Sequence, residues 1–450
     1  MNDWIVVGGG YRGIAASHLL AKEGHKVTLV EKEPFLGGVM YSHEWEDFYI
    51  DLGCHLFDNS EDRITEINFE IMGDDVIPVH VNYAAITDGH RSDGIIIPDF
   101  TLLEPARRKR LLEEMLAAAD AGADPATAAD MDEMLRRRFG KLAAELLAPK
   151  IYKYFGLSPE TLDPLARHMA PFTKLYVTDD STAMELKKNP AYDEILAASS
   201  QDDPMKFYRD KAKGYPHRNF YPKNKGMRGF CEKALAHLPT LGVEVLLGRG
   251  VADITKQAAE LAVHLEDGET LHGHKVLWTL GGGSLGQLLF GEDPLDDLIH
   301  PVPLAIYYFA LPREKVSDDT YIHDYSHDGL VVRHSAPGVY SGQVRDDGMT
   351  YVCMEAFTRK DAPLWQDPEA FLDPVWGEAV HAGLVYGDRP ECHHILQAPV
   401  SFKVPKKGFS AVLEGVLNRI TGFSDHIVLV EQTAFTKEAI FTKVLNAAAA

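Results

Sequence analysis

The sequence has little cysteine, no long apolar run and no recognisable secretion signal. Its 450 residues include only four cysteines, Cys54, Cys231, Cys353 and Cys392, which are scattered without metal-binding or redox spacing. Such usage is typical of a reducing compartment, so we expect a cytoplasmic protein. No apolar stretch reaches the length of a membrane span, and a strand pattern occupies the N-terminus where a signal peptide would lie, so we expect no membrane span.

Basic residues are also scarce relative to acidic ones. Lysine and arginine number 45 against 67 aspartate and glutamate residues, a formal net charge of −22. This excess repels phosphate backbones, so nucleic acid is not an expected partner. Two basic runs, residues 107–110 and 136–138, are flanked by acids and are interpreted as solvated helix faces. His323, Asp324 and His327 imitate metal spacing, but they fall in a predicted hairpin, so we predict no metal site.

The most informative pattern is a strand, turn, helix and strand at the N-terminus. An apolar run at residues 4–7 leads into Gly-Gly-Gly-Tyr-Arg-Gly at residues 8–13, which matches G-x-G-x-x-G. An alanine-rich helical stretch and a second apolar run at residues 27–30 follow. Glu31 then closes the second strand, near the distance at which an acid accepts the ribose hydroxyls of an adenine dinucleotide. The pattern predicts a bound dinucleotide; a glycine-rich loop in an ordinary α/β domain is the alternative.

Each residue of this turn has a predicted task. Gly8 permits the tight turn, Gly10 lets the backbone approach a pyrophosphate, and Gly13 lets the helix pack closely on the strand. Tyr11 and Arg12 begin the helix, whose first N–H groups present a partial positive charge to the phosphates.

Further glycines suggest other contacts with the same ligand. Lys32 follows the acid, and the pair Gly37 and Gly38 predicts a second close approach of the backbone, with a plain turn as the alternative. Another glycine cluster starts at Gly281, after a strand predicted at residues 275–280. It lacks the G-x-G-x-x-G spacing, so it is interpreted as a close-packed loop over the first cofactor.

The order of patterns along the chain predicts a discontinuous cofactor domain. Residues 102–147 have helical periodicity, and residues 302–357 alternate like antiparallel strands. Residues 179–214 are polar and aperiodic, which suits either a lid or surface decoration. We predict a cofactor domain of residues 1–75, 220–300 and 400–446, a substrate domain of residues 76–219 and 301–399, and a vector-derived tail at 447–450.

Taken in order, these motifs resemble the flavoproteins of the amine oxidase, protoporphyrinogen oxidase and UDP-galactopyranose mutase superfamily. The resemblance rests on the N-terminal fingerprint with its acid, the following glycine pair, and YPKNKGMRGF at residues 221–230. It implies an α/β fold with a Rossmann-like FAD-binding domain of the GR2 type. It also implies an inserted α+β substrate domain that contains an antiparallel sheet and a helical part. The cofactor would be FAD, with the backbone of Val251 meeting the adenine.

The mutase branch offers the closest local similarity. Residues 53–57 look like the segment that places a histidine, here His55, beside the isoalloxazine ring. Arg333 resembles the arginine that contacts the sugar-nucleotide pyrophosphate, a task that suits its planar fork. The alternative for His55 is a hydrogen-bonded histidine in a buried turn, and the alternative for Arg333 is a charged residue on a surface strand. The C-terminus departs from the mutases, because Glu431 would repel a pyrophosphate where they carry a Gly-Arg pair.

These observations predict an FAD-dependent oxidoreductase that acts on a polar small molecule. The substrate would be a sugar nucleotide or an amine or alcohol metabolite, oxidised by hydride transfer to flavin N5, with His55, Lys223 or Lys225 as the base. One alternative is a flavin-dependent nucleotide-sugar mutase without net redox, in which Arg333 clamps the diphosphate. A nicotinamide-dependent dehydrogenase and a non-catalytic flavin-binding scaffold are the others. The sequence allows a homodimer and names neither the substrate nor the electron acceptor.

Overall fold

The chain forms two compact units. The computed structural model describes residues 1–59, 62–169, 172–199, 219–257 and 260–429. Unit 1 comprises the described parts of Met1–Val79, Phe207–Asp297 and Ala411–Ala450, and unit 2 those of His80–Lys206 and Leu298–Ser410. Residues 400–410, which we predicted with the cofactor domain, belong to unit 2, because β18 (His393–Pro405) pairs with β14 (Ile299–Pro312). Glu431 and the predicted tail lie outside the described residues.

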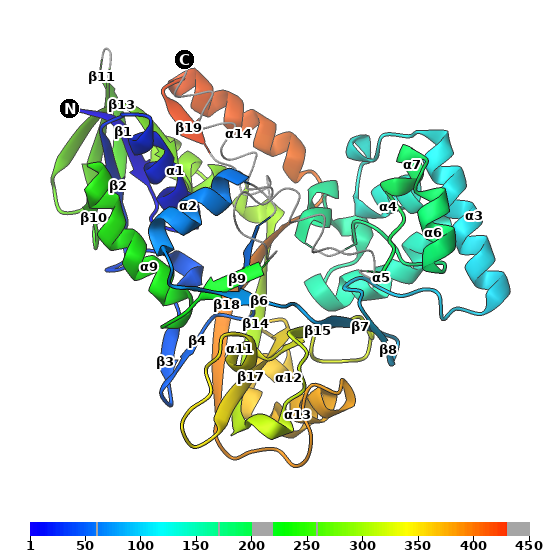
Figure 1. The fold of residues 1–450 in the computed structure, drawn as a ribbon. Coiled ribbons are helices and arrows are strands. Elements are labelled where there is room, and N and C mark those ends of the chain that lie inside the picture. The colour runs from blue at the N-terminus through cyan, green and yellow to red at the C-terminus, as the bar shows by residue number, and fades with distance from the viewer. Residues whose placement is uncertain (60–61, 170–171, 200–218, 258–259, 430–450) are drawn as a thin grey trace. The chain divides into compact units, whose positions relative to one another are not determined.

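Unit 1 is built on a mixed sheet that contains both strands of the N-terminal strand, turn, helix and strand pattern (Figure 1). Its strands are β1 (Asn2–Val7), β2 (Val27–Val30), β10 (Glu244–Leu246), β11 (Val251–Gln257), β12 (Glu260–Leu265), β13 (Thr270–Trp278) and β19 (Ile427–Leu429). The order is β10-β2-β1-β13-β12-β11, and β19 pairs with β13. Strands β10, β2, β1, β13 and β19 pair in parallel, whereas β12 pairs in antiparallel fashion with both β13 and β11. All four residues of β2 are buried, as expected for a central parallel strand covered on both faces.

Helices and two small sheets complete unit 1. They are α1 (Tyr11–Lys22), α2 (Asp62–Met72), α9 (Gly226–His237), α10 (Gly282–Phe290), α14 (Phe409–Phe423), the pair β3 (His43–Trp45) and β4 (Phe48–Ile50), and the sheet of β5 (Phe57–Asp58), β9 (Asn219–Pro222) and β6 (Val76–Val79). Helix α9 begins at Gly226, inside the YPKNKGMRGF motif of residues 221–230. The reason is local: Lys225 adopts a left-handed φ of 61°, which turns the chain into the helix soon after β9.

The core of unit 2 is a seven-stranded sheet in the order β18-β14-β17-β16-β15-β7-β8. Besides β14 and β18 it contains β7 (Tyr83–Thr87), β8 (His90–Asp93), β15 (Tyr321–Asp324), β16 (Arg333–Ser335) and β17 (Met349–Phe357). All neighbours are antiparallel except β15 and β7. One face buries alternate residues of β14 against α13 (Leu372–His381), where the rings of Phe309 and Trp376 lie 5.2 Å apart.

A helical part packs around a second apolar cluster of unit 2, as the periodicity of residues 102–147 predicts. It contains α3 (Pro105–Ala121), α4 (Met131–Phe139) and α5 (Lys141–Phe155). Side chains of Glu104 and Asp130 accept hydrogen bonds from the first turns of α3 and α4, and Gly122 ends α3 in a left-handed conformation. Two short helices, α6 (Asp180–Leu186) and α7 (Pro190–Asp193), lie in the segment expected to be irregular, which is described up to residue 199. The remaining helices are α11 (Pro337–Tyr340) and α12 (Pro363–Gln366).

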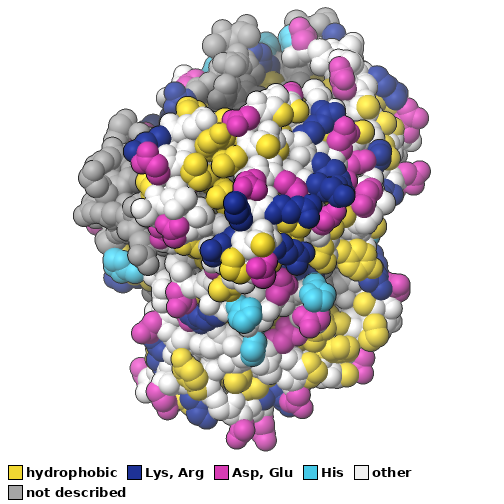
Figure 2. Space-filling view, turned by 90° about the vertical axis from the view of Figure 1, so that its right-hand side faces the viewer, with side chains coloured by type: hydrophobic (Ala, Val, Ile, Leu, Met, Phe, Trp, Pro, Cys, Tyr) yellow, Lys and Arg dark blue, Asp and Glu magenta, His cyan; other side chains and the backbone are white. Residues whose placement is uncertain are grey.

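Several residues of the basic runs are paired with acids one turn away. Arg136 lies 2.5 Å from Asp132, and Arg137 lies 2.6 Å from Glu133. On the face that carries α3, dark blue basic side chains accordingly alternate with magenta acidic ones (Figure 2). Within the described ranges, no helix is both long and apolar enough to cross a bilayer.

Removing volume from the helical cluster should destabilise unit 2. Leu147 of α5 is fully buried in this cluster, so Leu147→Ala should lower the free energy of unfolding by about 2–5 kcal/mol through lost burial and a residual cavity. Urea or thermal unfolding measures the change. Glu145→Ala, at an exposed position on the same helix, is the matched control and should change stability little. Equal effects of the two substitutions would contradict the assignment of this core.

Candidate functional site

Two glycine loops meet at the carboxyl end of β1. The Gly37 N–H donates to the Gly9 carbonyl at 2.8 Å, and Gly10 and Gly37 form a parallel bridge. Gly37 has a φ of 112°, and a side chain there would come within 2.2 Å of the Cys231 sulfur. A Cβ at Gly13 would lie 1.8 Å from the Gly8 carbonyl oxygen. Only glycine therefore fits these contacts, which hold the start of α1 against both loops.

The N-terminus of α1 is open to an anion. Its N-cap residue, Gly10, makes no side-chain cap, and no described atom lies within 4 Å of the Cβ position at Gly10. The first N–H groups of a helix carry a partial positive charge and are a ready site for phosphate. Glu31 lies beside this end of the helix and is buried, and its carboxylate accepts the N–H groups of Gly9 at 2.5 Å and Glu33 at 2.9 Å.

The third glycine cluster lies next to the first. The Thr279 N–H and hydroxyl both donate to the Val7 carbonyl, at 3.1 and 2.8 Å, which ties the end of β13 to the end of β1. Gly281 follows with a φ of 99° and precedes α10. The loop that we predicted over the cofactor thus starts at the same sheet edge as Gly8, whose Cβ position lies 2.3 Å from the Thr279 hydroxyl oxygen.

Other predicted cofactor residues differ in their exposure and in the partners of their side chains. The Tyr11 hydroxyl donates to Asn68 at 2.9 Å, and the Tyr11 ring packs against two phenylalanines, so only its backbone remains for a phosphate. Arg12 is half-buried, and Lys32 is exposed and lies 3.8 Å from Glu33. Val251 begins β11 and is half-buried.

A buried acid that sequence reasoning missed joins the segments around the glycine loops. Asp51, 1% exposed, accepts hydrogen bonds from the hydroxyls of Ser42 at 2.5 Å and Tyr221 at 2.6 Å, and from the Met227 N–H at 3.3 Å. Burial raises the pKa of Asp51 to about 6, although these three donors oppose the shift. An acid within the apolar run at residues 48–52 was the available signal.

Two of the predicted bases lie in different surroundings within unit 1. His55 is half-buried, and its Nε2 lies 3.1 Å from the Leu52 carbonyl oxygen. A carbonyl can only accept, so Nε2 carries the proton and Nδ1 is the basic nitrogen. Lys223 follows β9 with an exposed side chain, and its backbone N–H donates to the Asp75 carbonyl at 2.9 Å.

Arg333, the predicted pyrophosphate ligand, belongs to unit 2 and pairs with an acid. Its Nε and Nη2 donate to the two carboxylate oxygens of Glu355, both at 2.7 Å, across the β16 and β17 pair. Glu355 is buried, so this bidentate pair is largely shielded from water. His323 lies on the neighbouring strand opposite Arg333, and burial and the Arg333 charge lower its pKa to about 3.

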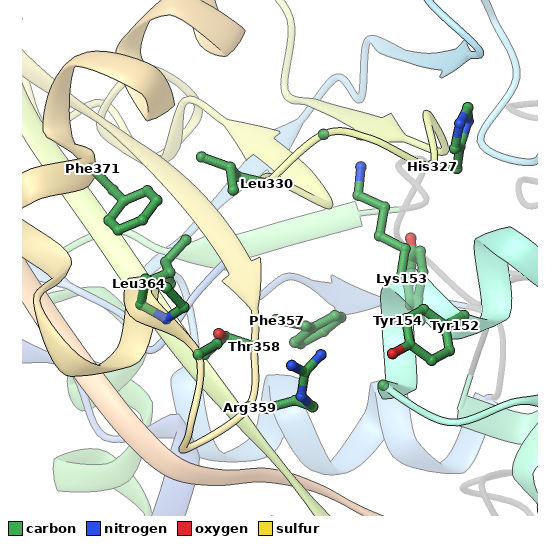
Figure 3. A pocket seen from close by; sticks show the side chains of 14 residues that line it. Tyr152, Lys153, Tyr154, His327, Leu330, Phe357, Thr358, Arg359, Leu364 and Phe371 are labelled. Carbon is green, nitrogen blue, oxygen red and sulfur yellow. The ribbon is translucent and has the colours of Figure 1, made fainter.

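Unit 2 also contains a cavity of about 320 Å³, a size that suits a small molecule (Figure 3). The side chains of Leu330, Leu364 and Phe371 lie on one side of it, and those of Lys153 and Tyr154 from α5 on the other. Burial lowers the pKa of Lys153, an effect that the nearby Asp324 and Glu378 carboxylates oppose. None of the residues predicted as catalytic lines this cavity.

The family follows from a match that covers well over half of the sequence. The sequence model described as flavin-containing amine oxidoreductase matches residues 13–308. The chain belongs to this family. Amine oxidoreductases of this family are flavoenzymes, so the chain is assigned as an enzyme with a flavin cofactor.

Solved structures show that the fold is that of the family. Reduced UDP-galactopyranose mutase superposes with a TM-score of 0.69 at 14% identity, covering 100% of this chain and 92% of that one. A putative protoporphyrinogen oxidase from Exiguobacterium sp. 255-15 gives 0.65 at 16% identity, with 98% of each chain covered. Putrescine oxidase bound to putrescine gives 0.62 at 12% identity, with 100% and 98% covered.

Curated relatives match only a short stretch of this chain. The 4,4'-diaponeurosporene oxygenase of Staphylococcus aureus (strain MRSA252) is 45% identical over 49 residues, 11% of this chain and 10% of that protein. The L-amino-acid oxidase of Naja atra is 41% identical over 51 residues, again 11% and 10%. The matches thus span about a tenth of the length of these relatives.

The residues of unit 1 fit the flavin cofactor of an amine oxidoreductase. The open space at Gly10 and the uncapped start of α1 would hold phosphate, and the Glu31 carboxylate can accept hydroxyl groups in addition to its two backbone donors. A flavin bound here would therefore contact mainly backbone at the carboxyl end of β1.

The buried Asp51 should make stability depend on pH. Its pKa rises from 3.8 to about 6 on folding, so the protonated form is favoured in the folded state and stability falls as pH rises from about 4 to about 6. The difference corresponds to roughly 3 kcal/mol. The asparagine of an Asp51→Asn variant cannot ionise and keeps an acceptor for the Ser42 hydroxyl. This variant should therefore not lose stability over that pH range. Thermal midpoints of both proteins from pH 4 to pH 7 provide the measurement. Parallel curves would contradict a raised pKa.

Proposed function

We propose that the protein is an FAD-dependent oxidoreductase that oxidises an amine or alcohol group of a polar small molecule. The observation that carries this proposal is the backbone cradle at Gly10, where the open helix N-terminus lies beside a second glycine loop and a buried acid. An acid at the end of the second strand is suited to the ribose of an adenine dinucleotide, which supports FAD over a flavin mononucleotide. Family membership supports the flavin.

His55 is the proposed base. When bound, the flavin would supply an acceptor for a hydride that leaves the substrate carbon. The substrate must also lose a proton from its hydroxyl or amine as the carbonyl or imine forms. His55 Nδ1 is the basic nitrogen in the tautomer that the Leu52 carbonyl selects, so we assign the proton to that atom. Lys223 is less suited, because its side chain is exposed to solvent and not held by an enclosed site.

The Arg333 environment favours net oxidation over a mutase reaction. A clamp for a nucleotide diphosphate needs uncompensated positive charge, but Glu355 binds Arg333 through both carboxylate oxygens. The two charges sum to zero, and the neighbouring His323 adds none near neutral pH because its pKa is lowered to about 3. A neutral or singly charged substrate suits this patch better than a diphosphate.

A methyl group at Gly10 should weaken FAD binding without unfolding the protein. Its φ of −67° suits any residue and nothing lies within 4 Å of the added Cβ, so Gly10→Ala should fold normally. The methyl group would occupy the space that a pyrophosphate approaches, and we expect at least about tenfold weaker FAD binding, or about 1.4 kcal/mol. Flavin-to-protein ratios after reconstitution with FAD measure this. Gly415→Ala, at an exposed position on α14 with no atom near its Cβ, is the control, and unchanged binding by Gly10→Ala would refute the cradle.

The reaction class can be tested with the purified yellow protein. An oxidoreductase should lose its flavin absorbance when an amine or alcohol substrate is added without oxygen, and should recover it when an acceptor is admitted. Flavin released by denaturation should be FAD by chromatography. Turnover of a UDP-sugar only after dithionite reduction would replace this proposal with a mutase. A His55→Gln variant should retain FAD and lose most of the rate of flavin reduction, about 10²–10⁴-fold for a lost base.

A further inference from the structure

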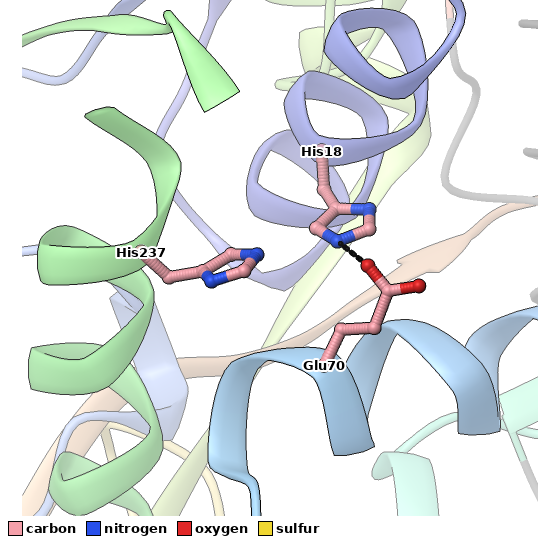
Figure 4. A group of neighbouring side chains, drawn as sticks. All are labelled: His18, Glu70 and His237. Atoms are coloured by element: carbon pink, nitrogen blue, oxygen red, sulfur yellow. Dashed lines mark hydrogen bonds and ion pairs between the residues drawn. The ribbon is translucent and has the colours of Figure 1, made fainter. Parts of the chain in front are cut away.

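Three helices of unit 1 bring two histidines and a glutamate together, away from the glycine loops. His18 lies on α1, Glu70 on α2 and His237 on the last turn of α9 (Figure 4). His18 Nε2 lies 3.0 Å from a Glu70 carboxylate oxygen. The two imidazole rings stack with their centroids 5.3 Å apart and their planes at 15°. One ligand atom of each residue lies within 4.8 Å of the other two.

Two buried nitrogens of this group have no partner among the described residues. They are His18 Nδ1 and His237 Nε2, and the His18 residue is only 2% exposed. The His237 ring points toward His18 and Glu70 (Figure 4). Leaving a buried polar nitrogen unsatisfied costs about 1–3 kcal/mol, so His237 Nε2 is better suited to a ligand than to packing alone. Burial also lowers the pKa of both histidines, which keeps them in the neutral form that binds metals.

We propose that His18, Glu70 and His237 bind one divalent transition-metal ion, of which zinc suits them best. Two imidazole nitrogens and one carboxylate oxygen are the donor set of three-residue zinc sites, with water as the fourth ligand. Ligand atoms around tetrahedral zinc lie about 3.4 Å apart, whereas those of the three residues lie within 4.8 Å of one another. A small rotation of the half-buried His237 side chain would bring its ligand nitrogen closer to the other two ligand atoms. The three residues lack metal spacing in the sequence, where we predicted no metal site. The ion would tie α1, α2 and α9 together.

Lys22 is the competitor for this site. Its Nζ lies 3.1 Å from the Glu70 carboxylate, and its side chain is 49% exposed. A metal ion would replace the ammonium at Glu70, and Lys22 can move into solvent when that happens. The proposal therefore makes an unusual prediction: Lys22→Gln, which removes a positive charge next to the ion, should bind zinc more tightly than the natural chain.

Calorimetric titration of the untagged, flavin-loaded full chain with ZnCl₂ tests the site. One zinc ion per chain is expected, and magnesium, which prefers oxygen ligands, should not compete. His237→Gln and Glu70→Gln should each weaken zinc binding at least about tenfold, the lower range for residues that support a metal site. His274→Gln, at an exposed position of the same unit, should bind like the natural chain. Circular dichroism confirms that each variant is folded.

Two results would overturn the proposal. One is no uptake of a stoichiometric zinc ion by the natural chain. The other is an unchanged affinity for zinc in a folded His237→Gln variant. Any bound zinc would then be held by other residues, since the chain has 20 histidines. Because the readout is metal binding and not turnover, the outcome does not depend on the proposed oxidation reaction. His237→Gln is the decisive variant, since a substitution at the fully enclosed His18 could disturb the packing of α1.

Discussion

Contact between main chains at the carboxyl end of β1 is the constraint on which unit 1 depends. Gly37 donates its N–H to Gly9, and a side chain at Gly13 would overlap the Gly8 carbonyl. No larger residue can replace Gly37 or Gly13 without moving the backbone. These contacts place the uncapped end of α1 between two glycine loops. A phosphate bound there would therefore contact mainly backbone, while the side chain of Tyr11 packs against Asn68 and two phenylalanines.

A buried charge adds a second constraint on the same region. Asp51 holds the segment after the second glycine loop, the end of β9 and the start of α9 through three hydrogen bonds. Burial of a carboxylate costs free energy, and the three hydrogen-bond donors offset only part of that cost. The pKa of Asp51 is therefore raised. The position of α9 matters because Gly37 packs directly on Cys231 of that helix. The acid thus supports the second glycine loop indirectly, through the position of α9.

Local signals made part of this architecture predictable. Strand β2 lies at the predicted residues 27–30, because its apolar run, the preceding helix and the closing acid fall within one short segment. Asp51 was not predicted as a site residue, since one of its partners is 176 residues away in the sequence. The Arg333 and Glu355 pair escaped prediction for a related reason. It depends on the register between β16 and β17, which the alternation of residues does not specify.

The charge balance of unit 2 is the feature on which the proposed reaction class depends. Solved structures with this fold include a mutase and an oxidase at 12–14% identity, so the backbone does not select the reaction. Side chains must do so. Here the Arg333 guanidinium is neutralised by Glu355, and the Tyr154 hydroxyl lies 3.3 Å from Nδ1 of the uncharged His323. An uncompensated arginine at this position would attract a diphosphate, whereas this neutral, aromatic group favours a substrate without one. The proposed preference for a substrate without a diphosphate therefore rests on one cross-strand ion pair and not on the fold.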